Sequence, residues 1–194
     1  MSEVLVRSES PVEYFRELVE SAMHRQRLTA REITAFYLVN LLTGFMHFDR
    51  SGAATEDEAL GLRYVKALNA GGVKQRDELR RVGDVSLFIA GFFADSLTRS
   101  LVDLDYYIQI GECAYGSLAR RDAALSDVFD ELAEKFSAFV DVLGDVSEHT
   151  ALATNSDLLR LYERWLRTGS RRSGDLLVAR GIVPNASLKQ RFVQ

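Results

Sequence analysis

Apolar residues recur every three or four positions along much of the chain. The clearest series contains eight apolar side chains, with acidic residues elsewhere around the helix axis: Leu125, Val128, Phe129, Leu132, Phe136, Phe139, Val140 and Leu143. A helix with this pattern buries one face and exposes the other. We therefore predict one amphipathic surface helix over 125–143.

The same spacing predicts further helices, and local signals mark several of their ends. Capping boxes begin at Ser10, Thr29 and Thr55, each with a glutamate three residues later. The helix after the third box is expected to end at Gly71-Gly72. Its expected buried stripe consists of Leu60, Tyr64, Val65 and Leu68. The 172 residues between the only two prolines contain no helix breaker of that kind, so helix can run almost unbroken.

Two segments, 30–46 and 82–97, are apolar nearly all round. A helix of this composition needs neighbours on several sides, so we predict that both are central. Four glycines in or near this region are expected to permit close helix packing: Gly83, Gly91, Gly111 and Gly116.

These patterns predict an all-α, compact single-domain bundle of seven to eight helices with two central apolar helices. A chain of 194 residues with 47% hydrophobic and 27% charged residues can bury a full core. The expected domain is 1–194, with 1–9 a flexible N-terminal segment and 185–194 a C-terminal tail.

Cysteine usage and the N-terminus bear on the compartment. Cys113 is the only cysteine and lies in an apolar stretch, so it is expected to be a small core residue in a reducing compartment, with the cytoplasm as the natural choice. The first residues carry acid and no long apolar run, so we expect no signal peptide. No apolar run is long enough to span a bilayer, and we expect no membrane contact.

Charge is unevenly distributed along a chain whose formal net charge is −4. Residues 156–194 hold eight Lys or Arg against three Asp or Glu. Five arginines form a candidate basic interaction surface: Arg160, Arg164, Arg167, Arg171 and Arg172. Such a surface can contact nucleic-acid phosphates. We favour the other interpretation, that it pairs with the acidic helix over 125–143, within the chain or across a dimer.

No sequence motif for catalysis, nucleotide binding or metal binding is present, and no cofactor or metal is expected. Polar residues within or beside the apolar helices form a candidate pocket: His47, Asp84, Asp95, Asp105 and Tyr107. Asp84 is the most unusual of them, because a buried carboxylate is costly unless it is paired. Pairing with Arg80 or Arg81, capping of a helix that restarts after Gly83, and a place in a polar pocket with a raised pKa are the alternatives; we favour structural pairing.

The sequence favours a non-enzymatic helical protein–protein interaction module that self-associates as a homodimer or binds a protein partner. The first alternative is a small-molecule-binding or enzymatic bundle that uses the polar pocket. The second is nucleic-acid binding through the basic C-terminal segment. Whether the protein is an enzyme stays open at this stage, although the missing motifs argue against it.

Overall fold

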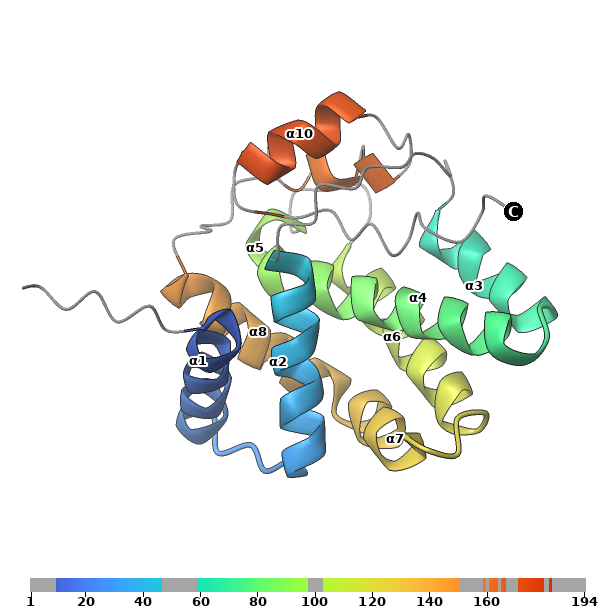
Figure 1. Cartoon of the computed structure of the whole chain (residues 1–194), viewed down its shortest axis with the longest axis horizontal. Coiled ribbons are helices and arrows are strands. Elements are labelled where there is room, and N and C mark those ends of the chain that lie inside the picture. The colour runs from blue at the N-terminus through green and yellow to red at the C-terminus, as the bar shows by residue number, and fades with distance from the viewer. Residues whose placement is uncertain are drawn as a thin grey trace, which may run out of the picture.

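All regular structure in the described residues of this computed structural model is helical (Figure 1). The structure describes residues 10–46, 59–97, 103–150, 159, 161–163, 165–166, 171–179 and 182. Its helices are α1 (Pro11–Arg25), α2 (Glu32–Met46), α3 (Leu60–Asn69), α4 (Gly72–Phe92), α5 (Ala94–Leu97), α6 (Leu104–Ala119), α7 (Ser126–Glu134), α8 (Phe136–His149) and α10 (Arg171–Ala179). The predicted all-α class is confirmed. Residues 1–9 and 185–194 lie outside the described residues.

Helix α4 lies at the centre of the packing, between α3, α6 and α8. Its second half is almost fully buried from Val82 to Phe92, whereas its first half is polar and partly exposed. The predicted central position therefore holds for the part of α4 that begins at Val82. Helix α2 packs on α1 and α7 but leaves Ile33 and Phe36 more than half exposed, so it is not covered all round.

The N-terminal ends of α1 and α2 are capped in different ways. At α1 the predicted capping box forms between Ser10 and Glu13. Helix α2 begins at Glu32, two residues later than expected from the Thr29 box. The N-terminal end of α2 lies against α7. There Oε2 of Glu131 accepts hydrogen bonds from the Arg31 N–H at 3.0 Å and from the Thr34 hydroxyl at 2.6 Å. A residue 100 positions away thus caps this helix. The Thr55 box lies outside the described residues.

The predicted single helix over 125–143 is wrong, because the chain breaks into α7 and α8 at Lys135. Lys135 leaves the helical region, with φ −107° and ψ 23°. Its ammonium group donates to the Thr29 carbonyl oxygen at 2.9 Å and to the Glu131 carboxylate at 2.8 Å. The two halves also pack on different neighbours, α7 on α6 and α8 on α4 and α1. The break therefore lets the two parts of the apolar stripe pack against different helices.

Candidate functional site

Asp84 binds two tyrosine hydroxyl groups at the junction of three helices. Its Oδ1 accepts a hydrogen bond from Tyr37 of α2 at 2.6 Å and one from Tyr115 of α6 at 2.7 Å. Helix α4 runs unbroken through Gly83, which rules out the alternative that Asp84 caps a helix restarting after that glycine. A Cβ at Gly83 would lie 2.6 Å from the Tyr115 ring, which shows how closely α6 approaches α4 here.

Neighbouring arginines do not form ion pairs with Asp84. Arg80 instead forms an ion pair with Asp122 at 3.3 Å, and its guanidinium lies 5.2 Å from the ring centre of Phe129. Arg81 forms an ion pair with Glu78 at 3.1 Å. The predicted pairing of Asp84 with Arg80 or Arg81 is therefore wrong, because its hydrogen-bond partners are phenols on two other helices.

The surroundings of Asp84 disfavour the charged form of its carboxyl group relative to water. Burial raises the pKa of Asp84 from 3.8 to about 6, against the lowering effects of the two phenol hydrogen bonds and of the Arg80 charge. Burial and the adjacent Asp84 charge also hold the pKa values of Tyr37 and Tyr115 above their ordinary value of 10. Both phenols therefore stay protonated as donors, and the cluster ties α2, α4 and α6 together.

Replacing Tyr37 by phenylalanine is expected to raise the pKa of Asp84 above 6. The change removes one donor that stabilises the carboxylate while it keeps the ring. The carboxyl carbon signal of Asp84 in a pH titration by NMR measures this shift. Tyr64→Phe is the control, because the Tyr64 hydroxyl bonds to Cys113 and Ser117 of α6 and not to Asp84. Equal titrations in the two variants would contradict the assignment of Tyr37 as a donor to the carboxylate.

The other predicted pocket residues do not join the Asp84 cluster within the described structure. Tyr107 is buried and donates to Glu163 at 3.0 Å, and Asp105 is exposed in the first turn of α6. His47 and the side chain of Asp95 lie outside the described residues. Among the described side chains, no group of three potential metal ligands lies together.

The predicted basic surface near the C-terminus is described at only one side chain. Arg171 is exposed at the start of α10. The residues outside the description are Arg160, Arg164, Arg167 and the side chain of Arg172. Cys113, which was expected in the core, is exposed on α6, so that prediction is wrong. The apolar stripe of α6 faces inward on either side of it, at Tyr107 and Ala114.

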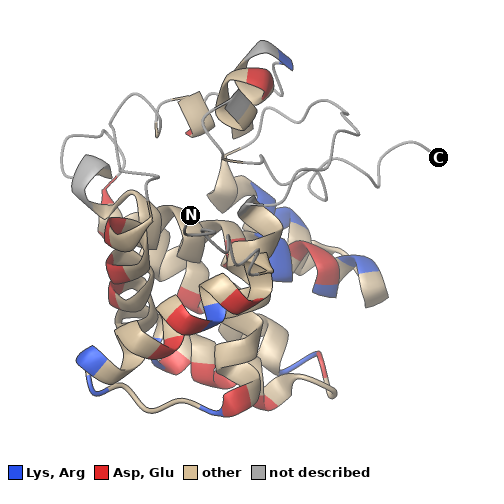
Figure 2. Ribbon diagram, turned by 60° about the vertical axis from the view of Figure 1, so that its left-hand side comes forward, with Lys and Arg blue, Asp and Glu red and all other residues tan. Residues whose placement is uncertain are grey.

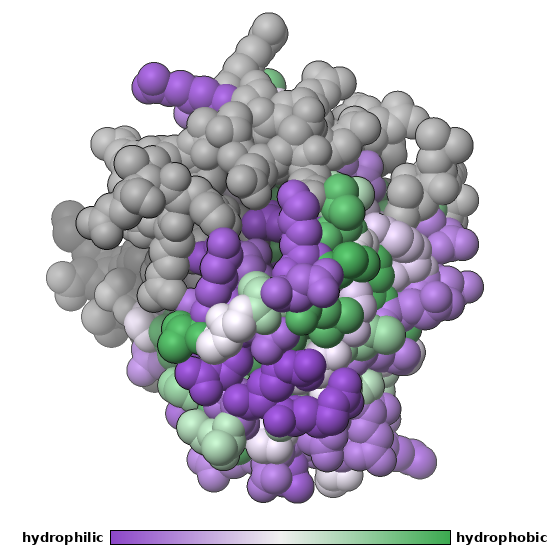
Figure 3. Space-filling view, turned by 90° about the vertical axis from the view of Figure 1, so that its right-hand side faces the viewer, coloured by the Kyte–Doolittle hydropathy of each residue, from purple (hydrophilic) through white to green (hydrophobic). Residues whose placement is uncertain are grey.

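Helix α3 has an apolar outer surface as well as a buried inner one. Its inner side buries Leu60, Arg63 and Ala67 against α4. On its outer side and the start of α4 lie four exposed side chains, here called the α3 face: Leu62 (52% exposed), Val65 (50%), Leu68 (37%) and Val73 (58%). Figure 3 looks onto this side of the molecule, where apolar side chains gather between hydrophilic ones. The predicted burial of Val65 and Leu68 is therefore wrong.

Basic residues outnumber acidic ones near the α3 face. Residues 60–76 contain four basic residues, Arg63, Lys66, Lys74 and Arg76, and the acidic residues Asp77 and Glu78 follow directly. Figure 2 shows a group of positive segments at the right of the view with a negative segment beside them, while further positive segments lie elsewhere in the molecule. Arg63 is buried and lies 3.6 Å from Glu78, while Lys66 and Lys74 are exposed. The face thus combines an apolar centre with nearby charged residues, of which Lys66 and Lys74 are the exposed ones.

Sequence reasoning missed the α3 face although two signals for it are present. Leu62 lies outside the helical stripe that begins at Leu60, so α3 is apolar on more than one side. The second signal is the local excess of basic residues over 60–76, which the larger excess near the C-terminus concealed. Only the packing of α3 on α4 shows which apolar residues remain outside.

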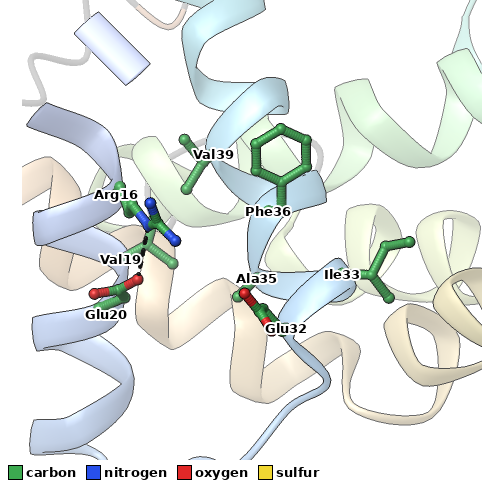
Figure 4. A pocket seen from close by; sticks show the side chains of 8 residues that line it. All are labelled: Arg16, Val19, Glu20, Glu32, Ile33, Ala35, Phe36 and Val39. Carbon is green, nitrogen blue, oxygen red and sulfur yellow. Dashed lines mark hydrogen bonds and ion pairs between the residues drawn. The ribbon is translucent and has the colours of Figure 1, made fainter. Parts of the chain in front are cut away.

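A second apolar surface is the groove between α1 and α2, here called the α1–α2 groove (Figure 4). It encloses about 500 Å³ and is lined by Arg16, Val19, Glu20, Glu32, Ile33, Ala35, Phe36 and Val39. Val19 and Val39 are buried at its base, and Ile33 and Phe36 are exposed at 52% and 54%. At the rim Arg16 forms an ion pair with Glu20 at 3.1 Å. The groove is therefore apolar inside with charged groups at its edge.

No family model, no curated protein and no solved structure matches this chain. Within the described ranges, no helix is both long and apolar enough to cross a membrane. The fold defines an all-α protein.

Proposed function

We propose that this protein is a non-enzymatic helical interaction module that binds a protein through the α3 face. The supporting observation is that half of the eight large apolar side chains exposed among the described residues belong to this one face. Single exposed apolar side chains are ordinary on protein surfaces, but a group of them bordered by polar residues is typical of a protein contact. Burying the group against a partner removes apolar area from water, which is favourable.

The composition of the face favours a protein over the alternative partners. An apolar centre with a charged rim is the usual anatomy of a protein–protein interface. A nucleic-acid surface needs exposed positive charge at phosphate spacing, and it gains little from a central group of leucine and valine. The most perturbed carboxyl group that is described, Asp84, is already bonded to two phenols and so serves the packing of the helices.

Replacing Val65 by glutamate is expected to reduce partner capture at least tenfold. The substitution places a charge at the centre of the α3 face, and about 1.4 kcal/mol lost at an interface centre already gives a tenfold effect. The measurement is capture on beads from an extract of the cells that make the protein, with the bound proteins quantified by mass spectrometry.

Leu176→Glu is the matched control, since Leu176 is 47% exposed but lies on α10. The proposal predicts proteins that the wild type and Leu176→Glu retain and Val65→Glu loses. It is wrong if Val65→Glu retains the same proteins as the wild type, or if the wild type retains none.

A further inference from the structure

The α1–α2 groove leaves apolar walls uncovered by the described residues. Its volume of about 500 Å³ falls within the range of roughly 300–1,000 Å³ that is usual for binding sites in proteins. Ile33 and Phe36 on the α2 wall are more than half exposed. Arg16 and Glu20 on the α1 wall form an ion pair with each other (Figure 4). The interior of the groove therefore suits an apolar occupant.

The side of α1 that lines the groove leads back to the N-terminal end of the helix. Val12, Arg16 and Val19 are four and three positions apart, which places them along one side of α1. The chain enters α1 at Ser10, whose backbone is extended, with φ −65° and ψ 146°. At a rise of about 1.5 Å per residue, Val19 lies about 14 Å along the helix from Ser10. Any segment that precedes Ser10 therefore starts within two to three turns of the groove.

The stretch that precedes Ser10 contains one run of apolar residues. Residues 1–9 lie outside the described residues, and their sequence has Val4, Leu5 and Val6 between Glu3 and Arg7. An extended chain covers about 3.3 Å per residue, so Leu5 can lie up to about 17 Å from Ser10. This reach exceeds the distance to the level of Val19 and leaves some length for a turn. The apolar run is therefore tethered at the distance that the groove requires.

Composition, position and reach together name an occupant for the groove. We propose that Val4, Leu5 and Val6 fold back along α1 and occupy the α1–α2 groove of the same chain, in place of the flexible segment expected from the sequence alone. These three residues, here called the N-terminal strap, then cover Ile33 and Phe36. The groove is closed to other molecules while the strap is bound. This contact does not involve the α3 face and does not depend on the proposed function.

Tethering favours the strap over a separate molecule. A free partner loses translational and rotational freedom when it binds, which costs several kcal/mol. A segment joined to the groove by a few residues has a high effective concentration there, about millimolar for a short flexible connection. Three apolar side chains are therefore enough for a contact that a free peptide of the same sequence would not maintain.

Nuclear magnetic resonance of the whole chain tests the contact directly. Nuclear Overhauser effects are expected between the methyl protons of the strap and the ring protons of Phe36. In Leu5→Asp the remaining contacts of Val4 and Val6 are expected to be lost, with the docking constant at least about tenfold lower, because a carboxylate is costly to bury in an apolar groove. Ser2→Asp is the matched control, since it adds the same charge to the segment outside the apolar run, and it is expected to retain the contacts.

A second pair of variants changes the groove instead of the strap. Phe36→Ser removes an apolar wall and is expected to release the strap, whose methyl signals then move to the positions of an unstructured peptide. Phe36 is 54% exposed, so the fold is expected to tolerate the change, and circular dichroism with the thermal midpoint checks this. Val73→Ser is the control, because Val73 is 58% exposed but belongs to the α3 face, and the contacts of the strap are expected to remain.

Four results would overturn the inference. The first is a wild type without contacts between the strap and Phe36. The second is a set of contacts that join different chains in a mixture of isotope-labelled and unlabelled protein, which would make a second copy the occupant. The third is an equal loss of contacts in Ser2→Asp and Leu5→Asp, which would assign the effect to charge rather than to apolar fit. The fourth is a strap that stays bound in Phe36→Ser. Partner capture through the α3 face is a separate measurement, so its failure leaves the strap unaffected.

Discussion

Replacing Gly111 by alanine is expected to destabilise the protein by about 3 kcal/mol, the upper end of the usual cost of overpacking a core. A Cβ at Gly111 would enter the ring of Phe136, the first residue of α8. Phe136 is fully buried and its ring lies 6.0 Å from that of Tyr115, so it has little room to withdraw. Urea unfolding measures the loss as a lower midpoint at an unchanged slope.

The matched control is the same substitution five residues later in the same helix. At Gly116 a Cβ would meet no atom closer than 3.9 Å. Gly116→Ala is therefore expected to stabilise the protein by about 0.5–1 kcal/mol, because alanine costs less than glycine in a helix interior. Equal effects at the two positions would show that α6 and α8 do not approach each other as described.

Replacing Asp84 by asparagine is expected to change the pH dependence of stability by about 3 kcal/mol. The carboxyl group has a pKa of about 6 in the folded protein and an ordinary value of 3.8. The folded state thus binds more protons than the unfolded state between these values, and this group's contribution to stability falls as pH rises from about 4 to about 6. About 1.4 kcal/mol per unit of pKa gives the stated size.

Asparagine keeps an oxygen that accepts from both phenols but carries no charge. Wild type and Asp84→Asn are therefore expected to be most similar in stability near pH 4, and the variant gains relative to the wild type up to about pH 7. Urea unfolding across this range measures the difference, which cancels the contributions of other titrating groups. Asp105→Asn shows the effect of removing a solvent-exposed charge. A wild-type-to-variant difference that is constant with pH would mean that the buried carboxyl is not the titrating group.

Local sequence patterns are enough to predict the helical class and several helix boundaries. The capping box at Ser10 and the glycine pair after α3 act through neighbouring residues, so a sequence pattern is enough to locate them. Gly72 takes φ +60° in that turn, a conformation that costs glycine little. The central position of the segment from Val82 also followed, because an apolar surface on all sides of a helix needs cover.

Which side chains meet and which remain exposed depends on how the helices pack. Asp84 lies 47 residues from Tyr37 and 31 from Tyr115, and no local pattern identifies phenols on other helices as its partners. The break at Lys135 depends on contacts with Thr29, more than 100 residues away. Val65 and Leu68 of the α3 face were assigned to the core because periodicity counts apolar residues without showing how many sides of a helix its neighbours can cover. These features depend on helix packing, whose contacts join residues that are distant in sequence.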